Sequence, residues 1–221
     1  MSLTLYYHPL ASFCHKVLVA LYENGVEFER RVINLADDAD RAELQAIWPI
    51  GKFPVIRDHA RKRVVAETTI IIEYLEHFFA GERPLIPRDW EDALEVRRWD
   101  RFFDQYLQAP MQHIVADHIR GGRSELSRER ATLSTAYRMI DRHMESRTWV
   151  SAQGFSMADC AAAPALFFTS SIEPFPDELR SLQAYFNRLI ERPSFRRVIE
   201  EAKPYFPLYP FASSLKGLSA S

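Results

Sequence analysis

The sequence contains little cysteine, which excludes folds that depend on disulfides or on structural zinc. Only two of the 221 residues are cysteine, Cys14 and Cys160, and they lie far apart in the chain. Disulfide-rich domains and zinc modules need several cysteines at close, paired spacings. This cysteine content fits a reducing compartment, and we expect the protein to be cytoplasmic.

Long hydrophobic runs are also missing. In the second half of the chain the longest apolar stretch without a charge is Cys160–Phe168, far below the roughly 20 residues that a membrane-spanning helix needs. A signal peptide begins with a basic segment followed by an apolar run, and Met1–Leu10 does not have this pattern. We therefore expect neither a membrane span nor a secretory leader.

Charge of one sign is not in excess. Lys and Arg number 28 against 30 Asp and Glu, and the formal net charge is −2. Proteins that bind nucleic acids or anionic membranes usually carry an excess of basic residues, so neither partner is expected. Hydrophobic residues make up 47% of the chain, which is enough for a core in one large or two small domains.

The first part of the chain alternates between strand and helix patterns. Strands are predicted at Leu3–His8 and Phe28–Ile33, where β-forming residues are common. Apolar residues at helical spacing predict helices at Phe13–Glu23 and Asp40–Ile47. The order of these elements indicates helices packed on a small mixed sheet.

A hairpin and a further helix complete this region. Two apolar pairs, Val55–Ile56 and Val64–Val65, flank the charged turn Asp58–Lys62 and bring the predicted strands to four. Thr68 is expected to cap the next helix. Residues 1–80 therefore predict an α/β domain, and residues 81–88, with one glycine and two prolines, predict a linker.

Strand patterns disappear after the linker, so residues 89–221 predict an all-α domain. We expect a long helix at Asp89–His118 with a kink or break at Pro110, because proline removes a backbone donor. The chain after Pro204 is expected to be irregular. Four more helices are predicted, at Ser127–Ser146, Ser156–Ser171, Asp177–Glu191 and Ser194–Ala202.

Three places in the α/β domain could carry chemistry. The turn that holds Ser12 and Cys14 opens a helix, where free N–H groups stabilise an anion. Pro54 enters a strand and could follow a cis peptide bond. Glu67 and Thr68 open another helix and could bind both charged ends of an amino acid. Taken singly, each is more often an ordinary cap, core residue or helix start.

Together these motifs resemble the glutathione transferase superfamily, in a serine-type or zeta-like bacterial branch. The resemblance covers nearly the whole chain. It rests on the turn at Ser12, the segment Gly51–Val55 and the helix start Glu67–Ile71, which occur in the family's order. In the second half, Ser156–Asp159 is similar to the family's buried capping box, which serves folding rather than catalysis.

The resemblance implies a thioredoxin-like first domain that binds glutathione as co-substrate. Pro54 would follow a cis bond, and Phe53 would offer its backbone amide and carbonyl to the cysteinyl part. Glu67 and Thr68 would hold the γ-glutamyl end, and Lys52 would lie near the glycine end. It also implies a homodimer with its two-fold axis beside the long helix of the second domain.

The catalytic group is less well defined by the resemblance. In many serine-type members, counting back from the helix valine, here Val17, places the catalytic serine at the position of Ala11. Three interpretations stay open: Ser12 donates to the thiolate, Cys14 forms mixed disulfides with glutathione, or backbone amides near Ala11 suffice. We favour Ser12 as the catalytic residue. His15 is expected at the surface without a role.

The resemblance implies a transferase that activates the glutathione thiol for attack on an electrophilic, partly apolar small molecule. Tyr106, Met111 and His113 are possible walls of its pocket, although aromatic and Met side chains on a helix are more often core. A zeta-like glutathione-dependent isomerase is an alternative. A binding or interaction protein without catalysis is another, supported by Ala11.

Overall fold

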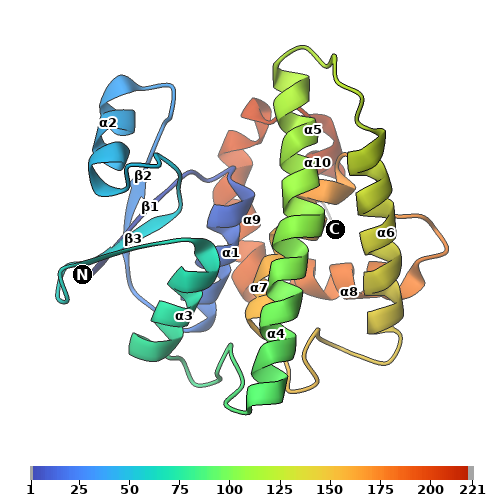
Figure 1. The fold of residues 1–221 in the computed structure, drawn as a ribbon, viewed down its shortest axis with the longest axis horizontal. Helices are drawn as coiled ribbons and strands as arrows, with labels where there is room; N and C mark the ends of the chain where they lie inside the picture. The colour runs from blue at the N-terminus through green and yellow to red at the C-terminus, as the bar shows by residue number, and fades with distance from the viewer. Residues whose placement is uncertain (1, 219–221) are drawn as a thin grey trace. The chain divides into compact units, whose positions relative to one another are not determined.

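The computed structural model describes residues 2–218, and the chain divides into two units between Leu85 and Ile86 (Figure 1). The first unit contains strands and helices, and the second is entirely helical in the part described. This is the fold class that the sequence predicts. The division falls within the segment predicted as a linker.

The first unit is a four-stranded sheet in the order β2-β1-β3-β4. β1 is parallel to β2 and antiparallel to β3, and β4 is antiparallel to β3. The elements are β1 (Leu3–Tyr7), α1 (Ser12–Glu23), β2 (Glu29–Val32), α2 (Asp38–Ile47), β3 (Val55–Asp58), β4 (Arg63–Ala66) and α3 (Thr68–Phe78).

Both faces of this sheet are covered, so every residue of β1 is buried. Tyr6 and Val55 pack with Leu44 of α2 in one apolar cluster. Because side chains alternate along a strand, Tyr7 points to the opposite face, where α1 and α3 pack together. Tyr6 and Tyr7 are therefore both buried, since the second face of the sheet is covered as well.

Asp58 fastens α3 to the far end of β3. Its carboxylate is fully buried and accepts hydrogen bonds from the Tyr74 hydroxyl at 2.8 Å, the Arg61 N–H at 2.9 Å and the Arg61 guanidinium at 3.0 Å. Burial acts to raise the pKa of Asp58, but these donors outweigh it and hold the pKa below its usual value. A charged carboxylate therefore ties sheet and helix together.

The second unit is built around a helix that is buried along its whole length, α7. The small side chains of Ala161–Ala163 let neighbouring helices approach closely, and α4 packs against α7. The elements are α4 (Trp90–Phe103), η1 (Asp104–Gln108), α5 (Ala109–Ile119), α6 (Ser127–Met144), α7 (Met157–Ser170), α8 (Arg180–Glu191), α9 (Pro193–Ala202), η2 (Lys203–Leu208) and α10 (Ala212–Leu218).

The predicted capping box at the start of α7 is present. Asp159 Oδ2 accepts hydrogen bonds from the Ser156 N–H and the Ser156 hydroxyl, both at 2.9 Å. Its other oxygen accepts from the Val150 N–H at 3.1 Å and the Tyr185 hydroxyl at 2.7 Å. Asp159 thus joins the start of α7 to the preceding loop and to α8.

The long helical run does not break at Pro110. α4, η1 and α5 follow one another without a loop, and the irregularity is the π-helical turn of η1, which ends at Gln108, two residues before Pro110. Proline cannot donate to the preceding turn, and its ring clashes with the carbonyl four residues earlier. A wider π turn at that place relieves the clash while the chain stays helical.

The end of the described chain is also more regular than expected. A 3-10 helix, η2, begins directly after α9, and a short helix, α10, follows it. Phe206 and Tyr209 are buried in this region, so apolar contacts hold a segment that local propensity leaves irregular. Within residues 2–218 no helix is both long and apolar enough to cross a membrane.

Replacing Asp159 by alanine is expected to lower the free energy of unfolding by roughly 3 kcal/mol or more, because several buried donors lose their acceptor. Urea unfolding followed by circular dichroism measures the change. Asp177→Ala, at an exposed carboxylate, is the control and should stay within about 0.5 kcal/mol of the parent. Equal stability of both variants would contradict a structural role for the capping box.

Candidate functional site

The pairing of the strands brings three separate segments together at one edge of the sheet, where β1 and β4 end and β3 begins. Tyr6 lies opposite Val55, and Val55 lies opposite Ala66. The chain leaving β1, the chain entering β3 and the chain leaving β4 therefore meet at the same edge. These segments carry Ser12, Phe53–Pro54 and Glu67–Thr68.

The turn between β1 and α1 is organised by His8, which the sequence analysis did not single out. The His8 carbonyl accepts from the Ala11 N–H at 3.0 Å, and its Nδ1 accepts from the Leu10 N–H at 3.1 Å. Its ring stacks on Phe53, with centroids 6.2 Å apart. Burial lowers the pKa of His8, so the ring is neutral at pH 7, and with Nδ1 accepting it carries its proton on Nε2.

Ser12 is the first residue of α1 rather than its cap. The N-cap is Ala11, and the helix has no side-chain cap. Ser12 is 5% exposed, and its hydroxyl makes no hydrogen bond to any other described residue. The Ser12 side chain therefore lies at the positive end of α1, and its O–H group has no acceptor among the described residues.

Cys14 and His15 are both buried, which changes the interpretation of each. Cys14 is fully buried, and burial raises the pKa of its thiol well above the ordinary value. A protonated, buried thiol is a poor nucleophile, which speaks against mixed disulfides at Cys14. His15 was expected at the surface, but it is also fully buried, and its Nε2 lies 2.5 Å from the Pro9 carbonyl oxygen. It fastens the turn to α1.

The segment that enters β3 places backbone atoms at the same edge. The peptide bond between Phe53 and Pro54 is cis. Gly51 has φ +67°, a left-handed conformation that suits glycine, and its N–H closes a turn on the Trp48 carbonyl at 2.8 Å. Pro54 is buried, Phe53 is half-buried and the Lys52 side chain is exposed.

Glu67 has a strained backbone where β4 turns into α3. Its φ is +68°, unusual for a residue with a side chain, and strain of this kind gathers at functional sites. Glu67, not Thr68 as expected, is the N-cap residue of α3, and the helix has no side-chain cap. Thr68 is 7% exposed and forms the first helical position, while Glu67 is exposed.

The helix starts at this edge differ from the third one in the unit. Asp37 caps α2 by accepting from the N–H groups of Ala39 and Asp40. α1 and α3 have neither a side-chain cap nor an acidic residue in the first turn. Their N-terminal N–H groups and dipoles are thus left to act on a bound anion.

A buried lysine connects α1 to α3. Lys16 of α1 is fully buried, and its ammonium donates to the Thr69 hydroxyl at 3.2 Å, in the first turn of α3. No local pattern in the sequence indicates this burial, because lysine on a helix is usually a solvated residue. The Lys16 side chain thus joins α1 to the first turn of α3.

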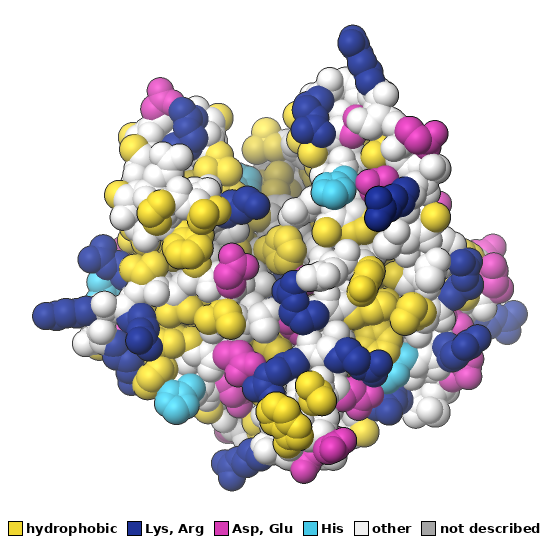
Figure 2. All heavy atoms as spheres, viewed as in Figure 1, with side chains coloured by type: hydrophobic (Ala, Val, Ile, Leu, Met, Phe, Trp, Pro, Cys, Tyr) yellow, Lys and Arg dark blue, Asp and Glu magenta, His cyan; other side chains and the backbone are white. Residues whose placement is uncertain are grey.

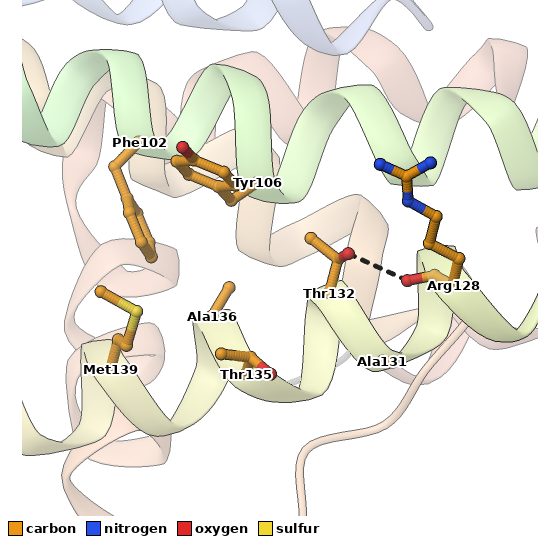
Figure 3. A pocket seen from close by; sticks show the side chains of 8 residues that line it. All are labelled: Phe102, Tyr106, Arg128, Ala131, Thr132, Thr135, Ala136 and Met139. Atoms are coloured by element: carbon orange, nitrogen blue, oxygen red, sulfur yellow. Dashed lines mark hydrogen bonds between the residues drawn. The ribbon is translucent and has the colours of Figure 1, made fainter.

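In the helical unit, the three residues predicted as pocket walls have different surroundings. Tyr106 is half exposed and lines a groove between η1 and α6 (Figure 3) whose walls include neither of the other two. Met111 is buried in the core, and His113 is exposed beside Glu129, with 3.5 Å between His113 Nδ1 and Glu129 Oε1. Gln108, which the sequence analysis missed, is fully buried in the π turn, and its carboxamide bonds to no other described residue.

Metal ligands are not gathered at this edge. In the described part of the chain no three His, Cys, Asp or Glu side chains lie close enough together to hold a metal ion. The groups available at the sheet edge are N–H donors, hydroxyls, one carboxylate and cations. They suit a small zwitterionic peptide better than a metal.

Relatives with this architecture include both an enzyme and a protein named for its localisation. FtsZ-localized protein A from Caulobacter vibrioides is 28% identical over 218 residues, covering 91% of this chain and 92% of that protein. Glutathione S-transferase GstB from Escherichia coli is 25% identical over 195 residues, covering 83% of this chain and 91% of the relative.

Solved structures carry the same fold. A glutathione S-transferase from Methylobacterium radiotolerans, in complex with glutathione sulfonate, superposes with a TM-score of 0.77 at 26% identity. The match covers 89% of this chain and 93% of that one. The family model for the glutathione S-transferase N-terminal domain matches residues 11–77, and the model for the C-terminal domain matches residues 102–193. Each unit thus matches one of the two family models, and the chain belongs to the glutathione transferase superfamily.

Proposed function

We propose that the protein binds glutathione at the sheet edge and activates its thiol for attack on an electrophilic, partly apolar small molecule. One observation carries the proposal: the register of β1, β3 and β4 brings two uncapped helix starts and the cis Phe53–Pro54 bond together. Glutathione is a tripeptide with two carboxylates, an amine and a thiol, and it needs hydrogen-bond donors and acceptors such as these segments carry.

Each end of glutathione has a matching group. The γ-glutamyl carboxylate binds at the start of α3, where Thr68 and the helix dipole favour an anion. The exposed Glu67 carboxylate pairs with the γ-glutamyl ammonium. The Phe53 backbone binds the cysteinyl part, and the exposed Lys52 lies nearest the glycine carboxylate.

Ser12 is proposed as the catalytic residue. A free thiol has a pKa near 8.5, and each unit by which the site lowers it requires about 1.36 kcal/mol of selective thiolate stabilisation. The unused Ser12 hydroxyl at the start of α1 supplies a donor, and the helix dipole supplies positive potential. Cys14 is not proposed in this role, because it is buried and protonated.

The reaction forms one carbon–sulfur bond. The bound thiol releases its proton to solvent, and the thiolate sulfur donates an electron pair to the electrophilic carbon. In a substitution, the leaving group departs with the electrons of its bond to that carbon. In an addition, those electrons pass to the acceptor group, which is then protonated. Holding the two reactants together lowers the barrier.

A binding protein that keeps this fold without catalysis is the second candidate. Ala11 occupies the position at which many serine-type members carry the catalytic residue, and Ser12 is one residue further along. The relative named FtsZ-localized protein A covers almost the full chain. In this alternative, glutathione or a protein partner binds, and no electrophile is turned over.

Two further properties complete the proposal. We propose a homodimer, with the two-fold axis beside the long helical run α4–η1–α5, as the family resemblance implies. We also propose that the protein acts in the cytoplasm, since a chain with two buried cysteines suits a reducing compartment.

The thiol titration tests the function directly. Thiolate absorbance of glutathione bound to the protein, followed against pH, should give a pKa lowered by two or more units from the free thiol. Ser12→Ala should raise that bound pKa by about one to two units, because a hydrogen bond to a charged group contributes about 1.5–3 kcal/mol.

The same variant should lower the rate of conjugation and leave glutathione affinity nearly unchanged, because the donor acts on the thiolate alone. Ser146→Ala, at an exposed serine, is the control. Glutathione binding with an unshifted thiol pKa, together with no turnover across a broad electrophile panel, would favour the binding protein instead.

Thr68→Val should separate binding from activation. The valine keeps the shape of threonine but removes the hydroxyl, so the dissociation constant for glutathione should rise about tenfold while the bound thiol pKa stays unchanged. Isothermal titration calorimetry measures the affinity, with Thr148→Val as an exposed control. An unchanged affinity would remove Thr68 from the binding site.

The homodimer is tested by light scattering at micromolar concentration. The mass should be twice that of a single chain, because the family interface is expected to bury enough area for a stable dimer. A single-chain mass that persists as concentration is raised would contradict the proposed assembly. The measurement does not depend on glutathione, so it is independent of the catalytic proposal.

A further inference from the structure

His8 contacts both of the segments that the proposed function assigns to the cysteinyl part of glutathione. Its backbone carbonyl and its ring Nδ1 accept from the N–H groups of Ala11 and Leu10, at 3.0 Å and 3.1 Å. One residue thus closes the turn that leads into Ser12. The same ring stacks on Phe53, with 20° between the ring planes. The turn that carries the thiol donor and the segment that carries the cis bond therefore meet at His8.

The shape of this turn depends on His8. Pro9 has no N–H group, and α1 begins without a side-chain cap. His15 Nε2 lies 2.5 Å from the Pro9 carbonyl oxygen, which fastens the turn to α1. Loss of the His8 ring would leave the Leu10 N–H without this acceptor and would remove the contact with Phe53. The link between the turn and the segment entering β3 would then be weaker.

The hydrogen bond from Leu10 requires a neutral His8 ring. Protonation converts Nδ1 from an acceptor into a donor that faces another donor, the Leu10 N–H. The side chain is half-buried, and burial lowers the pKa of His8 below its usual value and favours the neutral form at pH 7. The turn is therefore complete at neutral pH, and it loses this hydrogen bond as pH falls through the pKa of His8.

Other titratable groups at this edge of the sheet leave the ring in its neutral state. They are Cys14 and His15 of α1, Lys52 next to Phe53 and Glu67 before α3. Cys14 is buried and protonated, and its interaction is with the His8 backbone. Lys52 and Glu67 are exposed and opposite in charge, so solvent screens both. Burial is thus the main influence on the protonation of His8.

We propose that neutral His8 is a positioning residue for thiol activation, which holds the Ser12 turn against the Phe53 segment so that the sulfur of bound glutathione lies within reach of the Ser12 hydroxyl. The inference rests on the proposed function and extends it to a residue outside the groups proposed to bind glutathione. His8 acts through the backbone of the turn, so its positive charge has no part in the mechanism. Protonation of the ring loosens the turn, and the site then binds an anion at the sulfur position more weakly.

Glutathione sulfonate is the probe for this proposal, because it carries a fixed anion where glutathione has a thiol. Its amine and carboxylates also keep their charges between about pH 5 and about pH 7. Calorimetric titration of the parent protein should show about tenfold weaker binding at the lower pH, because the Ser12 donor is then displaced. A direct charge contact predicts the reverse, since an imidazolium near the sulfonate would attract it more strongly in acid.

Two substitutions separate the two contacts of the His8 ring. An asparagine side chain accepts from the N–H two residues further on and does not titrate, so His8→Asn keeps an acceptor for Leu10. Its sulfonate affinity should stay within about threefold of the parent at pH 7 and constant as pH falls. His8→Phe keeps an aromatic ring against Phe53 without the acceptor. It should bind the sulfonate about tenfold more weakly at pH 7 and raise the pKa of bound glutathione by about one unit.

A surface histidine supplies the matched control. Figure 2 shows histidine side chains at the surface among charged ones. His77 is exposed in the last turn of α3, at the opposite end of that helix from the candidate site. His77→Asn should therefore bind the sulfonate with the affinity and the pH dependence of the parent. Thermal unfolding of each variant shows whether it is folded, and if His8→Phe is not, the pH profile of His8→Asn still tests the proposal.

The outcomes that overturn the positioning role differ from those that overturn the proposed function. Parent affinity for the sulfonate that is constant or rises toward acid would exclude positioning by neutral His8. Equal weakening by His8→Asn and His8→Phe would exclude it as well, since the acceptor for Leu10 would then have no effect. In both cases the sulfonate still binds, and the proposed function stands. Failure of the parent to bind either glutathione or its sulfonate would overturn the proposed function and this inference with it.

Discussion

The candidate site depends on the register of three strands. A shift of one residue between β1 and β3 would move the side chains of one strand to the opposite face of the sheet and carry the Phe53–Pro54 segment away from the start of α1. The register is fixed because both faces of the sheet are covered, with Tyr6 and Val55 under α2 and Leu5 on the opposite face. The same packing that forms the core thus sets the geometry of the edge.

The electrostatic potential at that edge depends on the starts of α1 and α3, which both lack a side-chain cap. α2 satisfies its first N–H groups with the Asp37 carboxylate, whereas α1 and α3 begin at Ala11 and Glu67 without such a cap. Stability would favour a cap at each start. Their omission leaves positive ends exposed to a ligand, and the strained backbone of Glu67 occurs at the same place.

In the helical unit, the buried Asp159 and its hydrogen-bond donors serve folding. Asp159 is shared by Ser156, Val150 and Tyr185, so one carboxylate satisfies donors from three segments around α7. The π turn of η1 keeps a long helix continuous ahead of Pro110.

The sequence by itself determined the two-part architecture, the order of the elements and the capping box, because periodicity, turn residues and the Ser156–Asp159 spacing act locally. Long-range packing decided the rest. His15 and Lys16 look like surface residues of a helix, yet both are buried, and no local pattern records that Lys16 reaches Thr69. The groove likewise needed the tertiary structure, since Tyr106 of η1 and the residues of α6 line it together only when η1 packs beside α6.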